Sequence, residues 1–361
     1  MATIQTQTEL PVWAEYGWID GGDPEHPGEG NHVRSKGCFL YLPEAKILDV
    51  TAYPEWNYDG SSTNQATTEN SEIMLRPVRV FRDPMKERRD PTLPVTVLVW
   101  CATYYPDGTP HETNYRHHLT EFIKENKEWD EDQDPLFGLE QEYQFVMRNE
   151  NEKSIIPEAE KQGEFYCGYT AGQRWGRRIV EEHARRCAAI GLILWGVNAE
   201  VAPGQWEYQT RPNLSVDAAD ELWVSRWILV RTAEDLEFNV RFHPKPLGEK
   251  FNGSGCHINF STKDMRETND AYKEILSKVE SYHATTPAWD SYGAENHLRL
   301  TGKHETSSMD KFTSGVSNRA VSVRIPYNTF KKGMGYLEDR RPAANIDPYR
   351  AILWILRAIR A

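Results

Sequence analysis

The chain has 361 residues, of which 39% are hydrophobic and 27% charged, a composition typical of a globular protein with two or three domains. Its 54 acidic and 42 basic residues give a formal net charge of −12, whereas a duplex-binding surface normally carries a basic excess, which argues against nucleic acid as a partner. The five cysteines are scattered without a C-x-x-C pair, which indicates buried free thiols in a reducing compartment and argues against a disulfide framework or zinc knuckle.

The sequence shows no feature typical of secretion or membrane insertion. Its first residues lack the charged and apolar regions of a signal peptide. The most apolar runs, residues 95–102 and 351–359, are far too short to span a bilayer. We therefore expect a cytoplasmic protein with no membrane partner.

The first hundred residues are rich in short extended segments. Pro94–Tyr105 is apolar on both alternating faces, which predicts a central strand, and Pro106–Gly108 predicts the turn that follows it. We place the domain boundary in this turn, with a small strand-rich domain at 1–108 and a larger domain at 109–361.

Helical periodicity appears only beyond this turn. Thr113 or Asn114 can cap a first helix, and apolar residues four apart predict a second over Gln173–Ile190. A longer helix is expected over Ser215–Phe238, and a final helix near Pro348, because proline suits the first helical turn. Strands and helices alternate without a strict βαβ rhythm, so the predicted class is α+β.

The most informative stretch reads FGLEQEYQF, over Phe137–Phe145. In a strand, alternate residues share a face, so Glu140, Glu142 and Gln144 point one way. Two carboxylates on one face of a buried strand repel each other and lose hydration unless a cation lies between them. Mg²⁺ and Mn²⁺ prefer such oxygen ligands, although an E-x-E pattern by itself is more often a solvated strand face.

Acidic residues recur on later predicted strands. Glu200 precedes a Pro-Gly turn, and Glu207 faces away from its aromatic neighbours Trp206 and Tyr208. Each of these glutamates, taken alone, also fits the wet side of a strand.

Two further segments extend the pattern. His257 shares a strand face with Asn259 and Ser261, and Glu338 shares one with Arg340. A lone histidine is more often a core residue than a ligand. If these side chains converge with the other acidic residues, the five carboxylates and one imidazole suffice for two or three adjacent ions.

Positive charge is concentrated in three segments, 297–306, 317–325 and 336–341. Arg319 and Arg324 flank a short apolar alternation in the second, and guanidinium groups bind phosphate or carboxylate in bidentate fashion. Salt bridges to neighbouring acids are the alternative for any single arginine. Carboxylates with arginines are what phosphoryl transfer requires, and the chain contains no P-loop motif.

Seven collinear motifs together resemble the type II glutamine synthetase family, whose members occur in eukaryotes and some bacteria. They are WNYDGSST (56–63), FGLEQEY (137–143), NAEVAPGQWEYQ (198–209), NGSGCHINFSTK (252–263), RLTGKHET (299–306), SNRAVSVRIP (317–326) and GYLEDRRPAANIDPY (335–349). The resemblance implies a β-grasp-like N-terminal domain. It also implies a catalytic domain with a curved antiparallel sheet flanked by helices.

The resemblance implies the following metal and nucleotide ligands. One metal ion is expected on Glu142, Glu200 and Glu207, and the ion that bridges the ATP phosphates is expected on Glu140, His257 and Glu338. Contacts to ATP are expected from Glu140, Glu207, Pro212, Asn259, Ser261, Arg319, Arg324 and Tyr336.

The resemblance also implies how the other two substrates are bound. Glutamate contacts are expected from Asn252, Gly253, Arg299 and Arg340, the two arginines also acting on the transition state. Ammonium is expected near Asp59, Glu207 and Glu305, with Ser62 and Tyr166 nearby. Asp59 would take a proton from ammonium, and Glu305 would belong to a flap that shields the intermediate.

The activity implied by the family is ATP-dependent ligation of ammonia to the γ-carboxylate of glutamate through γ-glutamyl phosphate, with Mg²⁺ or Mn²⁺. The family also implies a homo-oligomer, typically a decamer of two pentameric rings with active sites between adjacent subunits. Two alternatives remain at this stage. The chain could ligate a larger amine, although Asp59 and Glu305 argue against this, or it could be a non-catalytic assembly protein, which should have lost metal ligands.

Overall fold

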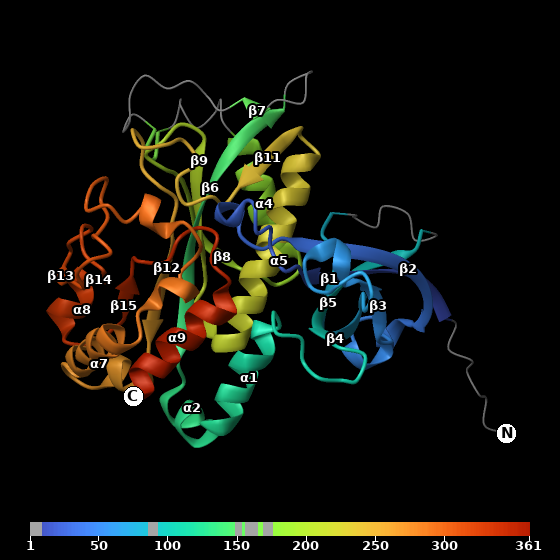
Figure 1. Ribbon diagram of the computed structural model, residues 1–361, viewed down its shortest axis with the longest axis horizontal. Helices are drawn as coiled ribbons and strands as arrows, with labels where there is room; N and C mark the ends of the chain where they lie inside the picture. The colour runs from blue at the N-terminus through green and yellow to red at the C-terminus, as the bar shows by residue number, and fades with distance from the viewer. Residues whose placement is uncertain (1–8, 86–92, 149–153, 156–164, 169–175) are drawn as a thin grey trace. The chain divides into compact units, whose positions relative to one another are not determined.

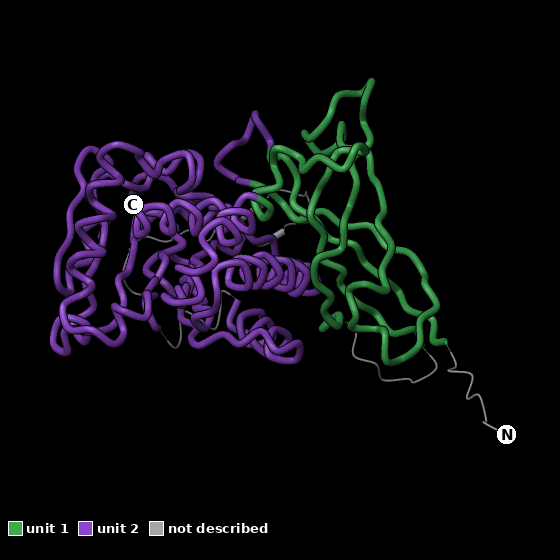
Figure 2. Tube along the Cα trace, turned by 90° about the horizontal axis from the view of Figure 1, so that it is seen from below, with its two compact units in different colours: residues 1–22, 31–117 green, residues 23–30, 118–361 purple. Residues whose placement is uncertain are grey.

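A computed structural model describes residues 9–85, 93–148, 154–155, 165–168 and 176–361. The chain divides into two compact units, one of residues 1–22 and 31–117 and the other of residues 23–30 and 118–361 (Figure 2). The predicted domain boundary at residue 108 stays a prediction.

The first unit is built on a five-stranded sheet in the order β2-β1-β5-β4-β3. Its strands are β1 (Glu9–Ile19), β2 (Val33–Pro43), β3 (Trp56–Asp59), β4 (Glu72–Arg82) and β5 (Val95–Tyr104). The β1–β5 pair is parallel and the other pairs are antiparallel. The predicted strand at 94–105 is confirmed as β5, in the middle of this sheet.

Alternating apolar residues hold the first unit together. Val12, Ala14 and Tyr16 of β1 and Val97 and Val99 of β5 are fully buried in one cluster. Residues two apart on a strand share a face, so the pairing of β1 with β5 places both rows on the same side of the sheet. Each large apolar side chain buried in this way contributes roughly 1.5–3 kcal/mol.

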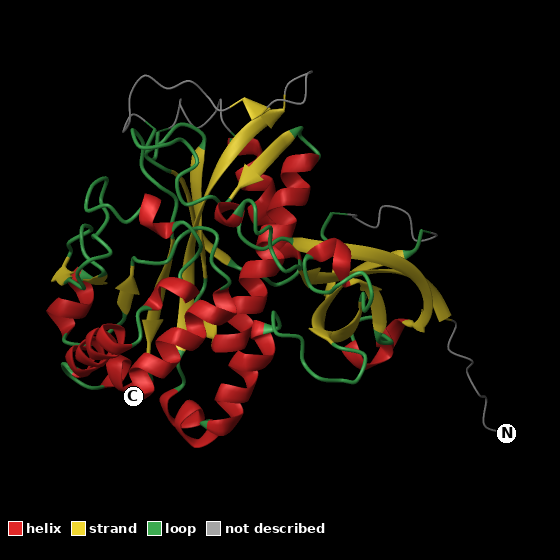
Figure 3. Ribbon diagram, in the orientation of Figure 1, coloured by secondary structure: helices red, strands yellow, loops and turns green. Residues whose placement is uncertain are grey.

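The second unit contains a strongly curled and largely antiparallel sheet of ten strands (Figure 3). Its main path is β13-β14-β15-β12-β6-β9-β8, and β7, β10 and β11 also pair with β6. The strands are β6 (Leu136–Arg148), β7 (Ser154–Ile155), β8 (Leu194–Ala199), β9 (Gln205–Thr210), β10 (Asn213–Leu214), β11 (Phe238–Arg241), β12 (Cys256–Ser261), β13 (Ser314–Val316), β14 (Val323–Ile325) and β15 (Leu337–Asp339). This arrangement, together with the strand-rich first unit, confirms the predicted α+β class.

The described α-helices all follow the strands of the first unit in the sequence, from Tyr115 onward (Figure 1). They are α1 (Tyr115–Glu125), α2 (Lys127–Gln133), α4 (Arg177–Ala189), α5 (Ser215–Glu234), α6 (Lys263–Glu267), α7 (Ala271–Thr285), α8 (Tyr327–Lys332) and α9 (Pro348–Arg360). Asn114 accepts a hydrogen bond from the His117 amide before α1, and Asp347 caps α9 just ahead of Pro348, so both predicted helix starts are confirmed.

The boundaries of α4 and α5 differ in part from the predicted ones. The predicted start of α4 at Gln173 lies outside the described residues. Its predicted end at Ile190 is one residue beyond the observed end at Ala189, where Ile190 is the C-cap and Gly191 follows with φ 83°. The prediction that the longest helix reaches Phe238 was wrong, because α5 ends at Glu234. Glu237 adopts a left-handed conformation with φ 62°, and Phe238 begins β11, whose hydrogen bonds to β6 replace helical ones.

The central strand β6 separates two environments. Gln141 points to the helical side, where its Oε1 accepts a 2.8 Å hydrogen bond from Nε of Arg226 on α5. Arg226 is itself buried and also donates to the carbonyls of Ala344 and Ile346. Glu140 and Glu142, one residue either side of Gln141, therefore point to the opposite side, where the site described below lies.

Two other predictions can be compared with the described residues. None of the helices there is both long and apolar enough to cross a bilayer. The cysteines are all free. The prediction that they are buried is confirmed for Cys101, Cys187 and Cys256, but it was wrong for Cys167, which is exposed, and Cys38 is only partly buried. Cys167 has a φ angle of 52° and belongs to no strand or helix of the described residues.

Candidate active site

The strand register of the second unit brings acidic residues from separate strands together. Glu140 on β6 lies directly opposite His257 on β12, and Glu142 lies opposite Glu207 on β9. On the far side of β12, Glu338 of β15 lies opposite Asn259. Directly opposed residues in an antiparallel pair project from the same face with Cβ atoms about 5 Å apart, so these side chains share one surface.

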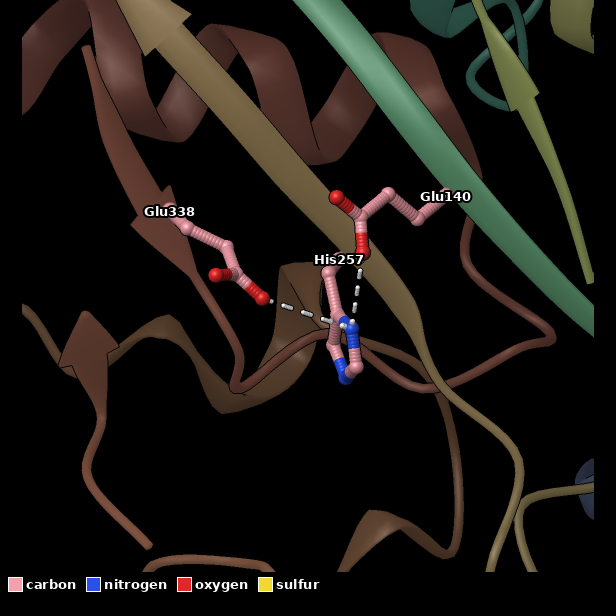
Figure 4. A group of neighbouring side chains, drawn as sticks. All are labelled: Glu140, His257 and Glu338. Carbon is pink, nitrogen blue, oxygen red and sulfur yellow. Dashed lines mark ion pairs between the residues drawn. The ribbon is translucent and has the colours of Figure 1, made fainter. Parts of the chain in front are cut away.

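Glu140, His257 and Glu338 form the first cluster of candidate ligands (Figure 4). Both carboxylates point toward the same ring nitrogen, and His257 Nδ1 lies 3.5 Å from Oε2 of Glu140 and 3.7 Å from Oε1 of Glu338. That nitrogen is buried and has no hydrogen-bond partner among the described residues. A buried polar atom without a partner is costly, and a bound cation would satisfy it.

A second cluster shares the same histidine. Glu142, Glu207 and His257 each offer a ligand atom within 4.8 Å of the others, and Glu142 Oε1 lies 4.0 Å from His257 Nε2. Glu200 lines the same cavity, and its Oε1 accepts a 2.9 Å hydrogen bond from Asn198. The donor set of carboxylate oxygens with one imidazole fits Mg²⁺ or Mn²⁺.

The electrostatics of the site favour a bound cation. Burial, with the nearby Glu200 charge, raises the pKa of Glu142 to about 8. Burial and three neighbouring glutamates raise the pKa of Glu207 well above its usual value. Burial, together with Arg340 and Arg299, holds the pKa of His257 well below its usual value, so the ring is neutral, the form that binds metals. Without a cation, the carboxylates are therefore driven to retain protons.

Arginines surround Glu338 and define the other side of the site. Arg324 and Arg340 each donate a 2.6 Å hydrogen bond to one of the Glu338 oxygens. Arg299 is fully enclosed and donates to the Arg340 carbonyl at 2.8 Å, while its Nη2 lies 3.0 Å from His257 Nε2. Burial lowers the pKa of Arg299 to about 10, which still leaves the guanidinium charged at neutral pH.

One cavity collects most of the predicted site residues. It is lined by Glu140, Glu142, Tyr166, Asn198, Glu200, Gln205, Glu207, Gln209, Asn252, Gly253, His257, Arg299, His304, Glu305, Thr306, Arg319, Arg324, Glu338 and Arg340. Six of these residues are glutamates and four are arginines, so the walls carry two more potential negative charges than positive ones. The cavity can therefore bind cations while presenting guanidinium groups to anionic ligands.

The rim of this cavity contains Glu305 and its neighbours. Glu305 Oε2 lies 4.0 Å from Nη1 of Arg319, and both side chains are about half exposed. His304 and Glu305 have φ angles of 52° and 61°. Two consecutive non-glycine residues in the left-handed region are unusual, and such strain is concentrated at functional sites.

Four predicted nucleotide contacts do not line the cavity. Asn259 donates to Glu140 Oε1 at 2.8 Å, and Ser261 Oγ accepts a hydrogen bond from Arg266. Tyr336 precedes β15 and is partly exposed, and burial of its hydroxyl, followed by the charges of Glu140 and Glu338, raises its pKa. Pro212 is exposed just after β9.

Asp59 and Ser62 belong to the first unit, whereas the cavity is lined by residues of the second. Asp59 caps a short 3-10 helix, η4 (Gly60–Thr63), and accepts hydrogen bonds from the Ser61 amide and from the hydroxyls of Ser61 and Ser62. These bonds lower the pKa of Asp59, which keeps its exposed carboxylate ionised.

Five cavity residues were not predicted: Asn198, Gln205, Gln209, His304 and Thr306. The two glutamines could have been found, because Gln205, Glu207 and Gln209 alternate along one strand and must share a face. Gln209 donates to Glu207 Oε1 at 2.8 Å, and Gln205 donates to Glu142 Oε2 at 3.1 Å. No comparable sequence pattern pointed to His304 and Thr306, which flank Glu305.

Comparison with known proteins agrees with this geometry. Residues 112–361 match the family model described as glutamine synthetase, catalytic domain. A glutamine synthetase of Saccharomyces cerevisiae is 43% identical over 344 residues, which cover 94% of this chain and 86% of the yeast protein. A glutamine synthetase of Agaricus bisporus is 41% identical, with 94% of this chain and 90% of that protein covered. The chain therefore belongs to the glutamine synthetase family, as the resemblance of its motifs to the type II members predicted.

Proposed function

We propose that this protein ligates ammonia to the γ-carboxylate of L-glutamate with ATP, giving glutamine, ADP and phosphate. The observation that carries the proposal is that the carboxylates of Glu140 and Glu338 both point toward the buried Nδ1 of His257, which has no hydrogen-bond partner among the described residues. Arginines on the same surface supply the anion-binding groups that phosphoryl transfer needs. Family membership supports the same reaction.

We propose that Glu140, His257 and Glu338 would hold the divalent cation that contacts ATP. Glu142, Glu200 and Glu207 would hold another, so that two or three Mg²⁺ or Mn²⁺ ions are bound per site. When bound there, such ions would supply positive charge that offsets the negative charge of the transferred phosphoryl group. The excess of glutamates over arginines in the cavity wall supports this assignment.

The remaining residues of the cavity would bind and orient ATP and glutamate. Arg319 and Arg324 would bind the phosphates of ATP, with Pro212, Asn259, Ser261 and Tyr336 around the nucleotide. Arg299, Arg340, Asn252 and Gly253 would hold glutamate. An oxygen of the γ-carboxylate then attacks the γ-phosphorus, the bond to ADP breaks, and γ-glutamyl phosphate forms.

Asp59 would act in the second half-reaction. Ammonium, held by Asp59, Glu207 and Glu305 with Ser62 and Tyr166 nearby, gives one proton to Asp59. The ammonia nitrogen attacks the γ-carbon and the carbon–oxygen bond to phosphate breaks. A second proton passes from the nitrogen to the departing phosphate, which leaves as hydrogen phosphate as the amide forms. The lowered pKa of Asp59 supports a carboxylate that is ionised when ammonium binds. Glu305 would help to exclude water, which would otherwise hydrolyse the acyl phosphate.

We also propose a cytoplasmic homo-oligomer, a decamer of two pentameric rings in which Asp59 of one subunit completes the site of its neighbour. The resemblance of the motifs to type II members supports this arrangement. The free thiols of the described cysteines support a reducing compartment.

The proposal is tested by following two products of one reaction. The purified protein is incubated with ATP, glutamate and either ammonium or hydroxylamine, with Mg²⁺ or Mn²⁺, and both ADP and the amide or hydroxamate are measured. Equal amounts of ADP and amide are expected, and Glu338→Gln should abolish both. ADP release that does not depend on glutamate and ammonium would refute the proposal, and reaction only with larger amines would indicate a different ligase.

A further inference from the structure

Gln205 occupies a buried position between two parts of the proposed site. It is 2% exposed, lies at the start of β9, and contacts both β6 and the loop at 253–254 through hydrogen bonds. We propose that Gln205 is a positioning residue that orients Glu142 toward the metal and ties it to the glutamate-binding loop. This inference rests on the proposed function.

The first contact sets the orientation of Glu142. Its Oε2 accepts hydrogen bonds from Gln205 Nε2 at 3.1 Å and from the Gly255 amide at 2.8 Å. Its Oε1 lies on the side of His257, 4.0 Å from Nε2. Two donors on one oxygen therefore hold the carboxylate so that the other oxygen is directed to the shared ligand cluster.

The second contact reaches the loop that we expect to bind glutamate. The same Nε2 lies 3.0 Å from the carbonyl oxygen of Gly253 and 3.1 Å from Oγ of Ser254. Gly253 is closely surrounded, because an added Cβ would lie 2.5 Å from the Pro244 oxygen and 2.7 Å from Cγ of Arg299. A shift of this carbonyl would therefore displace the backbone that packs on Arg299, which is itself a proposed glutamate ligand.

The Gln205 amide is itself held in place. Its Oε1 accepts a 3.2 Å hydrogen bond from the Ala202 amide, and its backbone oxygen accepts a 2.8 Å bond from the Glu200 amide. Because its Oε1 and its Nε2 are both hydrogen-bonded, the side-chain amide of Gln205 is fixed in position and in turn holds Glu142 and Gly253 in place. Loss of the amide should therefore weaken metal binding and glutamate binding together.

Gln209 provides a matched control on the same strand face. Like Gln205, it donates to a carboxylate of the cluster, the Oε1 of Glu207 at 2.8 Å. Among the described residues, however, it has no hydrogen bond to the loop at 252–255. Gln209→Met should therefore weaken the binding of the metal without changing the binding of glutamate.

The experiment compares the full-length wild type with Gln205→Met and Gln209→Met. Mn²⁺ affinity is measured by electron paramagnetic resonance without substrates, and kcat and the KM for glutamate are measured at saturating Mn²⁺ and ATP. We expect Gln205→Met to weaken Mn²⁺ binding by about 10–100-fold. It should also raise the KM for glutamate by roughly fivefold or more, since a buried carbonyl loses its donor. Gln209→Met should weaken Mn²⁺ binding but leave that KM within about twofold of wild type.

Folding is checked by circular dichroism and thermal unfolding. If Gln205→Met does not fold, Gln205→Asn, which keeps the amide but draws it back by one methylene, should show both effects in the same direction. Unchanged Mn²⁺ affinity, or weakened Mn²⁺ binding with an unchanged KM for glutamate, would overturn the inference. If the wild type makes no glutamine, the proposed function fails, while the Mn²⁺ measurement still tests whether Gln205 positions Glu142.

Discussion

Removal of divalent metal should make the stability of this protein fall as the pH rises from 6 to 7.5. Burial and the neighbouring glutamates raise the pKa values of Glu142, Glu200 and Glu207, with Glu142 at about 8. In the metal-free folded protein the Glu142 carboxyl therefore retains a proton in this range that the unfolded chain has already released. At Glu142 the folded state binds more protons than the unfolded state in this range, so through this group each increase in pH favours unfolding.

The size of the effect follows from Glu142. Its carboxyl has a pKa of 4.5 when unperturbed and about 8 in the folded protein, so the stability it contributes is complete below pH 4.5 and is lost as the pH approaches 8. Each pH unit between these values costs about 1.4 kcal/mol, so the change from pH 6 to 7.5 costs about 2 kcal/mol. For a unit of this size, that corresponds to a decrease in Tm of roughly 4–8 °C.

The assay is thermal unfolding at pH 6 and 7.5, at one protein concentration, in the presence of EDTA or of Mn²⁺. With EDTA, Tm should be lower at pH 7.5, whereas with Mn²⁺ the decrease should be smaller or reversed, because the cation requires deprotonated ligands. Glu142→Gln is the matched control, since it removes this titration and should reduce the pH dependence in EDTA by about 2 kcal/mol. Buried His183, His257 and His283, whose pKa values are lowered, act in the opposite direction in both proteins, so the difference between wild type and Glu142→Gln isolates this carboxyl. The same pH dependence in the two proteins with EDTA would refute the reasoning.

Two further substitutions test other parts of the molecule. Asp59→Ala should retain ATP binding, measured by titration calorimetry, but lose most glutamine formation, because ammonium would lose its proton acceptor; undiminished synthesis would contradict that role. Arg341→Met should lower the free energy of unfolding in urea by about 3–5 kcal/mol, because Asp339 would remain charged and buried without its 2.5 Å partner. Combining it with Asp339→Asn should restore part of the loss, and a loss below about 1 kcal/mol in the single variant would show that the pair contributes little.

The local periodicity of the sequence was sufficient to predict which side chains share a face, because that depends only on their own strand. Glu140 and Glu142 share a face because they are two residues apart, and the same rule places Glu338 and Arg340 together in the cavity. The capped start of the helix at Pro348 was predictable for the same reason, since its signals lie within a few residues.

Predictions were less successful where a residue's structure or burial depends on segments distant in the sequence. The helix expected to reach Phe238 ends earlier, because that residue pairs with β6, more than ninety residues before it in the chain. Cys167 was expected to be buried, but its burial depends on neighbours that composition cannot identify. The role of Gln205 went unnoticed because its partners Glu142 and Gly253 come from two other segments.

The amino-acid sequence alone determined the class of the fold, the faces of the individual strands and the identity of the candidate ligands. Those properties follow from local spacing and from motifs that can be read along the chain. Only the tertiary structure decided that His257 lies opposite Glu140 and that Glu207 lies opposite Glu142. Strand register is set by hydrogen bonds between distant segments, and a shift of one residue would turn a strand's carboxylates to the opposite face.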